Sequence, residues 1–241
     1  MALPQLSTSK YELTLPSTGE TVEYRPFLVK EEKILLTAQG TGETIDVLKA
    51  VEQIIDNCTF NKLQVKGLPM FDLEYVFIKL RSKSIGSEVE VTVTAPDDNV
   101  TEVPVKINLE DIQCVKEVGH TNNIKLTDNV GIVFDYPRIE SVKFNSADGG
   151  EEAFDIMKNC VRQIYDSENV YEKTDMEEGE LNEFLENMSH DQFEKVQEFF
   201  NTMPKVKLSV KVKNPKTGAD GEVVLEGMNS FRVIINLFCL S

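Results

Sequence analysis

The sequence predicts an α+β protein in which several antiparallel β-hairpins surround two apolar helices, with an acidic helical insertion. Three segments alternate apolar and polar residues around a polar turn, as hairpins do, namely residues 11–27, 88–108 and 205–225. Two other segments carry apolar residues at helical spacing. Residues 148–199 hold 16 acidic and 4 basic residues, yet their apolar residues recur at helical spacing, which favours helices over a disordered acidic tail.

The most apolar of the expected helices lies between Gly67 and Glu88. Pro69 suits the entrance of a helix, and Gly86 suits a left-handed residue at its end. Two apolar stripes cover most of its circumference, which predicts a buried helix. The stripes are Phe71, Tyr75 and Ile78, and Leu73, Val76, Phe77 and Leu80. One stripe could serve the fold and the other a partner chain.

Charges are segregated along this helix, with Asp72 and Glu74 in the first turn and Lys79, Arg81 and Lys83 in the last turns, which suits the helix dipole.

An earlier helix, from about Glu43 to Asn57, has a single apolar face, and we expect the two helices to pack together. Residues 30–38 fit a short strand or a helix.

The hairpins are followed or separated by shorter elements. Residues 109–115 and 124–136 fit short strands, the latter stopped by Pro137. The first and last hairpins have a similar order of strand, turn and strand, so they could share one sheet.

Three helices are expected in the acidic segment. The first carries Phe154, Met157, Val161 and Ile164 on one face, and the second carries Leu181, Phe184, Leu185 and Met188. Thr174 and Glu177 fit a capping box before the second helix, and Ser189 and Gln192 fit one that starts the third. The third helix buries Phe193, Val196, Phe199 and Phe200 and must end before Pro204.

These patterns suggest three regions. Residues 1–146 form an α+β core with the first two hairpins, residues 147–204 form an acidic helical segment, and residues 205–241 form the last hairpin and an apolar tail that packs back on the core.

Composition restricts the function. A net charge of −16 argues against binding to nucleic acid or to an anionic membrane, because both require a surplus of Lys and Arg. The start of the chain is unlike a signal peptide, so we expect cytoplasmic synthesis and reduced cysteines. The four cysteines have no CxxC spacing, so we expect no metal and no cofactor.

Catalytic residues are not apparent, and we expect no enzymatic activity. Ser189, His190 and Asp191 are the residue types of a hydrolase triad, but neighbours in sequence point in different directions and a helix cap already explains Ser189. His120 is expected to be a loop residue, and the sequence indicates no partner for it.

The last residues are apolar without a polar face, which predicts burial within the fold or against another chain. For contacts with a partner we favour a set of large apolar residues in this tail. They are Phe231, Ile234, Ile235, Leu237 and Phe238.

Several segments resemble the baseplate hub family of T-even-like contractile-tailed bacteriophages. The longest is LPMFDLEYVFIKLRSKSIGSEVEV at residues 68–91, with others at 10–36, 105–112, 124–137 and 199–218. The resemblance implies a structural protein of the tail baseplate in the virion, made in the host cytoplasm, that contacts other baseplate and tail proteins and could form a homo-oligomer. The alternative is an assembly factor, absent from the virion, that holds a tail protein transiently. Some relatives carry CxxC pairs in the central β region, but this chain has Ala95 to Asp98 there, so a zinc site is not transferred.

Overall fold

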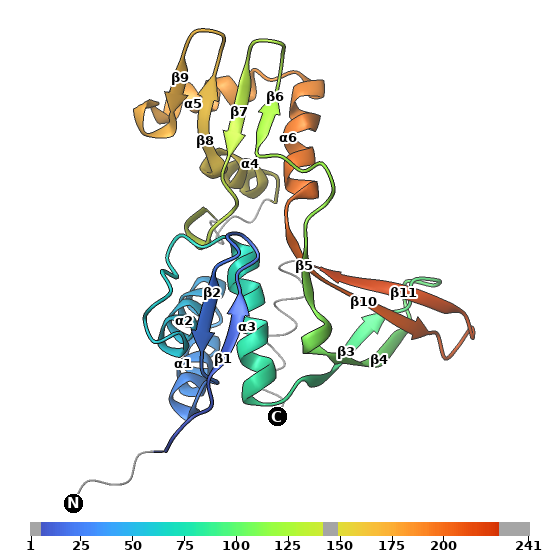
Figure 1. The fold of residues 1–241 in the computed structure, drawn as a ribbon. Helices are drawn as coiled ribbons and strands as arrows, with labels where there is room; N and C mark the ends of the chain where they lie inside the picture. Colours follow the sequence, from blue (N-terminus) through green and yellow to red (C-terminus); the bar gives the residue numbers. More distant parts are fainter. Residues whose placement is uncertain (1–5, 142–148, 227–241) are drawn as a thin grey trace, which may run out of the picture. The chain divides into compact units, whose positions relative to one another are not determined.

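The computed structural model describes residues 6–141 and 149–226. It has the expected α+β architecture, with helices packed beside small antiparallel sheets (Figure 1). The chain divides into two compact units. Unit 1 comprises residues 1–115 and 205–241, and unit 2 comprises residues 116–204.

Unit 1 begins with the expected hairpin of β1 (Tyr11–Thr14) and β2 (Thr21–Tyr24), in which Tyr11 lies opposite Tyr24. Three helices follow, α1 (Val29–Gln39), α2 (Thr44–Cys58) and α3 (Met70–Ser84). Residues 30–38, which fit either a strand or a helix, are therefore helical. The helices α2 and α3 pack together as expected, and Gly86 has a φ of 117° just beyond α3.

A buried ion pair joins β2 to α1. The guanidinium of Arg25 lies 3.0 Å from Oε1 of Glu31, and both side chains are almost fully buried. Glu31 also accepts a hydrogen bond from the N–H of Leu28 at 2.8 Å, so it caps α1. Burial raises the pKa of Glu31, but the hydrogen bonds from Arg25 and Leu28 outweigh burial and leave the pKa below its ordinary value. The N–H of Arg25 donates to the carbonyl of Cys58, which extends the network to α2.

Helix α3 is enclosed by its own chain, since each of its residues is buried or half-buried. Both apolar stripes are thus used in the fold, and the idea that one serves a partner chain is not supported. Three of its charged residues, Asp72, Glu74 and Arg81, are buried as well. Asp72 accepts hydrogen bonds from the N–H and hydroxyl of Ser17 at the tip of the first hairpin. Arg81 donates to the carbonyl of Gly86 at 3.0 Å.

Glu74 differs from Asp72, because no residue that the structure describes forms a hydrogen bond or an ion pair with its carboxyl. Its side chain is buried, and burial alone raises its pKa to about 8. Burial together with the nearby carboxylates of Asp72 and Glu74 raises the pKa of the Cys114 thiol to about 12. Because its pKa is about 8, the Glu74 carboxyl is mostly protonated at neutral pH.

The β-rich part of unit 1 contains two hairpins and a short strand. The hairpins are β3 (Glu88–Thr94) with β4 (Glu102–Asn108), and β10 (Lys205–Lys213) with β11 (Asp220–Glu226). The strand β5 (Gln113–Val115) pairs with β10, placing Val115 opposite Lys205. The first and last hairpins do not share a sheet, because β5 occupies the edge of β10 and β1 pairs only with β2 among the strands described.

The tips of these two hairpins are joined by polar groups. The Asn214 amide donates to Oδ1 of Asp97 at 2.9 Å and to Oδ2 of Asp98 at 3.0 Å, and the Thr217 hydroxyl donates to Asp97 at 2.6 Å. These hydrogen bonds hold the pKa of Asp97 below its ordinary range. Gly221 lies so close to Pro96 that a side chain there would collide with the proline ring. A network of Asp97, Asp98, Asn214 and Thr217 therefore joins the two tips.

Unit 2 is built on a four-stranded antiparallel sheet in the order β6-β7-β8-β9. Its strands are β6 (Asn123–Lys125), β7 (Gly131–Phe134), β8 (Val161–Tyr165) and β9 (Val170–Glu172). Its helices are α4 (Gly149–Cys160), α5 (Glu178–Glu186) and α6 (His190–Thr202).

Two expectations for the acidic segment were wrong. The first helix ends at Cys160, and Val161 and Ile164 belong to β8, because pairing with β7 satisfies their backbone and buries both side chains. Thr174 does not cap the second helix; Glu177 does, and its N–H donates to the carboxylate of Glu180 at 3.2 Å. The third helix starts at Ser189 and ends before Pro204 as expected.

The core of unit 2 lies where α6 meets the sheet. Phe199 is buried, and its ring stacks on Phe134 at 5.0 Å and meets Phe200 edge-on at 4.9 Å. Strand β7 pairs with β8 of the acidic segment, and β6 pairs with β7. The boundary between the units therefore lies at Lys116, well before residue 147, where acidic residues become frequent.

We predict that Glu31→Ala lowers the free energy of unfolding of unit 1 by ~3–5 kcal/mol, because it leaves the Arg25 guanidinium buried without its carboxylate. Chemical denaturation would measure the change. The control is Glu32→Ala on the same helix, a half-buried position that should change stability by less than ~1 kcal/mol. Equal changes in the free energy of unfolding for the two substitutions would show that the loss of the ion pair does not destabilise unit 1.

We predict that Glu74 makes stability depend on pH. Its pKa is raised to about 8 in the folded protein from 4.5, so the folded state binds the proton more tightly, and stability falls as pH rises from about 5 to 8. The difference in unfolding free energy between Glu74→Gln and the natural chain should then grow by up to ~1.4 kcal/mol per pH unit in this window. Denaturation at several pH values tests this, and a difference that does not vary with pH contradicts it.

Candidate interaction groove

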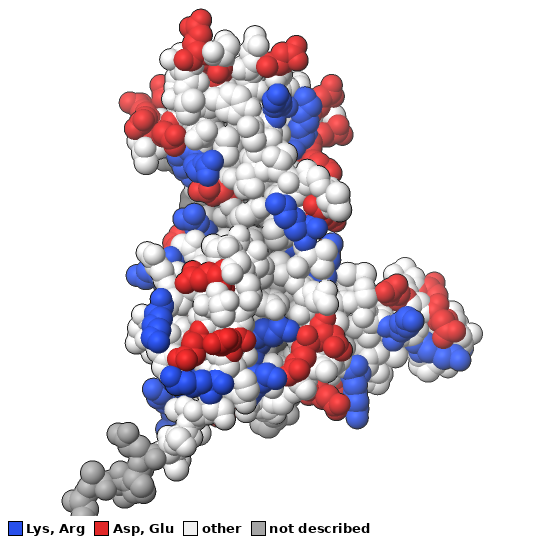
Figure 2. All heavy atoms as spheres, in the orientation of Figure 1, with Lys and Arg blue, Asp and Glu red and all other residues white. Residues whose placement is uncertain are grey.

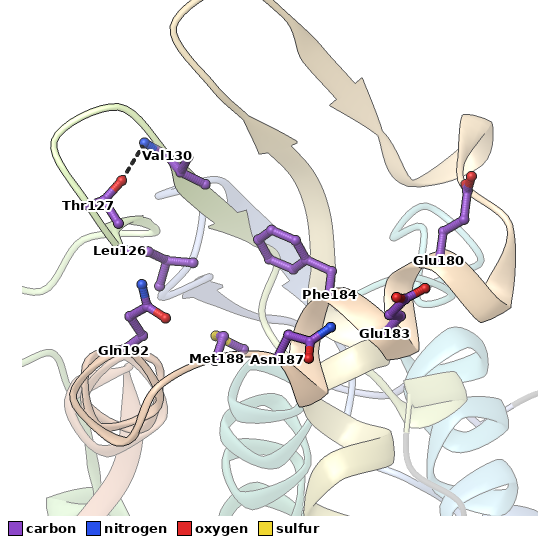
Figure 3. Close-up of a pocket in the computed structure, with 9 residues that line it drawn as sticks. All are labelled: Leu126, Thr127, Val130, Glu180, Glu183, Phe184, Asn187, Met188 and Gln192. Atoms are coloured by element: carbon purple, nitrogen blue, oxygen red, sulfur yellow. Dashed lines mark hydrogen bonds between the residues drawn. The ribbon is translucent and has the colours of Figure 1, made fainter.

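A cavity of about 450 Å³ lies in unit 2 between the β6–β7 hairpin, α5 and the start of α6. Figure 3 shows Phe184 and Met188 on one side and Leu126 and Val130 on the other. The nine lining residues are Leu126, Thr127, Val130, Glu180, Glu183, Phe184, Asn187, Met188 and Gln192.

Local hydrogen bonds fix the walls of this cavity. The Thr127 hydroxyl accepts from the N–H groups of Asn129 and Val130, which closes the turn between β6 and β7. Ser189 and Gln192 form the expected capping box directly after Met188 and set where α6 begins. The Lys195 ammonium donates to the carbonyl of Leu126 at 3.0 Å, which ties α6 to the hairpin.

A second cavity of about 330 Å³ adjoins the first and shares Val130, Glu180 and Phe184 with it. Its other lining residues are Ile164, Tyr165, Asp166, Tyr171, Met176 and Leu181. We call the two cavities together the α5 groove. Its surface is mostly apolar, and Tyr171 at its end is 45% exposed.

Three acidic side chains line the α5 groove, and no lysine or arginine does so among the residues that the structure describes. Asp166 accepts hydrogen bonds from the N–H groups of Glu168 and Asn169, which hold its pKa below the ordinary value. Glu180 accepts from the N–H of Glu177. Glu183 is exposed, and no hydrogen bond or ion pair to its carboxylate is formed by the residues that the structure describes. The lining is therefore apolar with three acidic side chains, and the Lys195 ammonium next to it is bound to the carbonyl of Leu126.

The contact residues expected from the sequence, Phe231, Ile234, Ile235, Leu237 and Phe238, lie outside the described residues. The triad residue types are not assembled for catalysis. The Ser189 hydroxyl accepts from the N–H of Gln192, and His190 is 82% exposed and lies 3.4 Å from Glu194 on the next turn.

His120 lies in a loop as expected, and the structure supplies the partner that the sequence did not indicate. Its Nδ1 lies 2.9 Å from the hydroxyl of Thr202, and its ring packs on Tyr136 and Phe199 with centroids 5.7 and 5.2 Å away. The loop folds back on the end of α6, a long-range contact that no local pattern reveals. Burial, and then the charge of Lys116, lowers the pKa of His120.

Within the described ranges, no group of three or more His, Cys, Asp or Glu side chains is placed to bind a metal ion. The same ranges contain no helix that is both long enough and apolar enough to span a membrane.

Comparison with known proteins gives one match. Residues 8–231 match the family described as T4 bacteriophage base plate protein. The chain belongs to this family. Searches of curated proteins and of solved structures found no match. Because the match covers both units, the baseplate assignment applies to the whole chain and not to a single module.

Membership identifies the chain as a phage baseplate protein, whose location is the virion tail and whose partners are other baseplate proteins. The sequence did not reveal the α5 groove of this baseplate protein. It placed Leu181, Phe184, Leu185 and Met188 on one buried face, but only Leu181 and Leu185 are buried, and Phe184 and Met188 are half-buried in the groove wall. Helical spacing cannot separate a residue that faces the core from one that faces a cavity beside it.

We predict that the His120 ring titrates below its ordinary pKa of 6.5, because protonation would place a charge where burial and Lys116 disfavour it. As His is protonated more readily in the unfolded chain, this group lowers stability as pH falls below about 6.5. A His190→Gln variant retains His120 as its one histidine, so an NMR titration of that variant assigns the signal directly. A midpoint at or above 6.5 would contradict the prediction.

Proposed function

We propose that this baseplate protein is a structural component of the hub region of a contractile phage tail, and that it acts through protein contacts during tail assembly and in the virion. The family match over residues 8–231 supports this most strongly. The segments that resemble hub proteins include residues 68–91, which cover α3, the most enclosed helix of unit 1.

The surface of unit 2 is also suited to protein contacts. The α5 groove offers apolar area beside carboxylates, and the Ser-His-Asp sequence forms a helix cap in place of a proton relay. We therefore propose that the chain has no catalytic role. The proposed partners are other tail proteins. We also propose that copies of the chain form a homo-oligomer within a symmetric baseplate.

A second candidate is an assembly factor that is absent from the virion and holds a tail protein transiently. The charge of unit 2 favours this version, since residues 116–204 contain 20 acidic and 8 basic residues. A strongly negative surface gives fast, reversible and salt-sensitive association with a basic partner.

Mass spectrometry of purified virions and baseplates separates the two versions. The structural proposal expects peptides of this chain in intact baseplates at a fixed ratio to known baseplate proteins. Their absence from baseplates, with their presence in infected-cell extracts, would reject the structural role and support the assembly factor. If the chain is present in virions and in isolated baseplates, at the same ratio to known baseplate proteins in each, the assembly-factor version is rejected.

We predict that truncation after Ser230 yields folded protein that no longer joins the baseplate, because the removed residues carry the proposed contacts Phe231, Ile234, Ile235, Leu237 and Phe238. Circular dichroism and thermal denaturation would establish folding, and complementation of a phage lacking the gene would measure assembly. A truncated chain that fails to fold would show that the tail belongs to the core, and normal assembly would show that the tail is not needed.

A further inference from the structure

The two cavities of the α5 groove share three lining residues. Phe184, Val130 and Glu180 line both, so they form a ridge between a site lined by Leu126 and Met188 and a site lined by Ile164 and Met176. Two apolar sites separated by a ridge suit two apolar side chains of one segment better than a single compact ligand.

The apolar residues of the groove can adapt to an occupant. Phe184 and Met188 are half-buried in the free chain, and Met176 is half-buried at the other site. Methionine has an unbranched, polarizable side chain that fits apolar groups of different shapes, and it is common at peptide-binding surfaces. Covering these side chains would remove apolar area from water, which is the main favourable contribution to such binding.

The charges around the groove define the other requirement. Glu180 and Glu183 lie next to Phe184, and Asp166 lies at the far site, with no described lysine or arginine in the lining. On the face that Figure 2 presents, acidic side chains gather at the strand tips and edges of unit 2, with a group of basic side chains beside α6. Unit 2 as a whole has a net charge of −12. An acidic segment would be repelled, whereas a lysine or arginine could lay its aliphatic stem over Phe184 and reach the carboxylates.

We propose that the α5 groove binds a segment of a neighbouring baseplate protein that carries two apolar side chains with a lysine or arginine beside them. The proposal rests on the proposed function, because it assigns a surface to the contacts of a baseplate protein. The apolar residues enter the two cavities, and the cation pairs with Glu183 and Glu180.

Two variants of the full chain test the proposal. Glu183→Lys reverses an acidic charge of the lining at an exposed position and leaves the core untouched. Its control is Glu186→Lys, which makes the same change at an exposed position of the same helix that lines neither cavity. Asn187→Trp narrows the first cavity from an exposed position. Circular dichroism and thermal denaturation establish that each variant is folded.

The probes are overlapping synthetic peptides that cover the other tail proteins of the same phage, together with a peptide of residues 227–241. Binding is measured by fluorescence anisotropy. The proposal expects the bound peptides to combine apolar residues with lysine or arginine. Glu183→Lys and Asn187→Trp should weaken them by at least ~10-fold, equivalent to ~1.4 kcal/mol, while Glu186→Lys should change affinity by less than about threefold.

Other outcomes overturn the proposal. Binding of no peptide, or equal binding by the natural chain and the Glu183→Lys variant, would exclude the groove as this site. Preference for the 227–241 peptide would assign the groove to this chain's own tail, and preference for acidic peptides would contradict the role of the acidic lining residues. If the groove variants lose the peptide but still enter baseplates normally, the groove proposal fails as an assembly contact while the proposed baseplate function stands.

Discussion

The buried pair between Arg25 and Glu31 is the interaction on which the arrangement of the first part of the chain depends. Glu31 accepts from the Arg25 guanidinium and from the N–H of Leu28, while the main chain of Arg25 donates to the end of α2 at Cys58. One carboxylate thus sets the start of α1, and one arginine sets where the hairpin meets α2. The desolvation of both ions is large, so the loss of one partner destabilises the fold far more than the intact pair stabilises it.

The same balance between desolvation and hydrogen bonding distinguishes the buried acids of α3. Asp72 is held by two donors from Ser17, and these oppose the effect of burial on its pKa, which still lies above the ordinary value. Glu74, two residues further, has burial as the cause of its raised pKa. A helix enclosed on all sides can therefore keep one carboxyl as a structural acceptor and leave the neighbouring one protonated, according to what faces each of them.

Local patterns predicted most of the elements, because alternation and helical spacing record which face of an element is buried. The hairpin of β3 and β4, the apolar helix α3 and the capping box at Ser189 followed directly from such patterns. The cap of α5 was misplaced by three residues, at Thr174 and not at Glu177. The other differences from expectation arose where a long-range partner decides the outcome. Val161 and Ile164 fit a helical face but pair with β7, and His120 packs on Phe199 from far away in the sequence. The α5 groove could not be predicted, since its walls come from α5, α6 and the β6–β7 hairpin, which only the tertiary fold brings together.

The pairing of β5 with β10 has a consequence for how the chain is organised. The chain leaves unit 1 after Val115 and returns at Lys205, and these two residues lie opposite each other in an antiparallel ladder. An antiparallel pair can be closed by a short turn. Unit 2 therefore occupies the position of a hairpin loop, so that it can be exchanged, shortened or enlarged without a change in the strands that carry it. Its acidic groove could then diversify independently of the rest of the protein, as loops generally do.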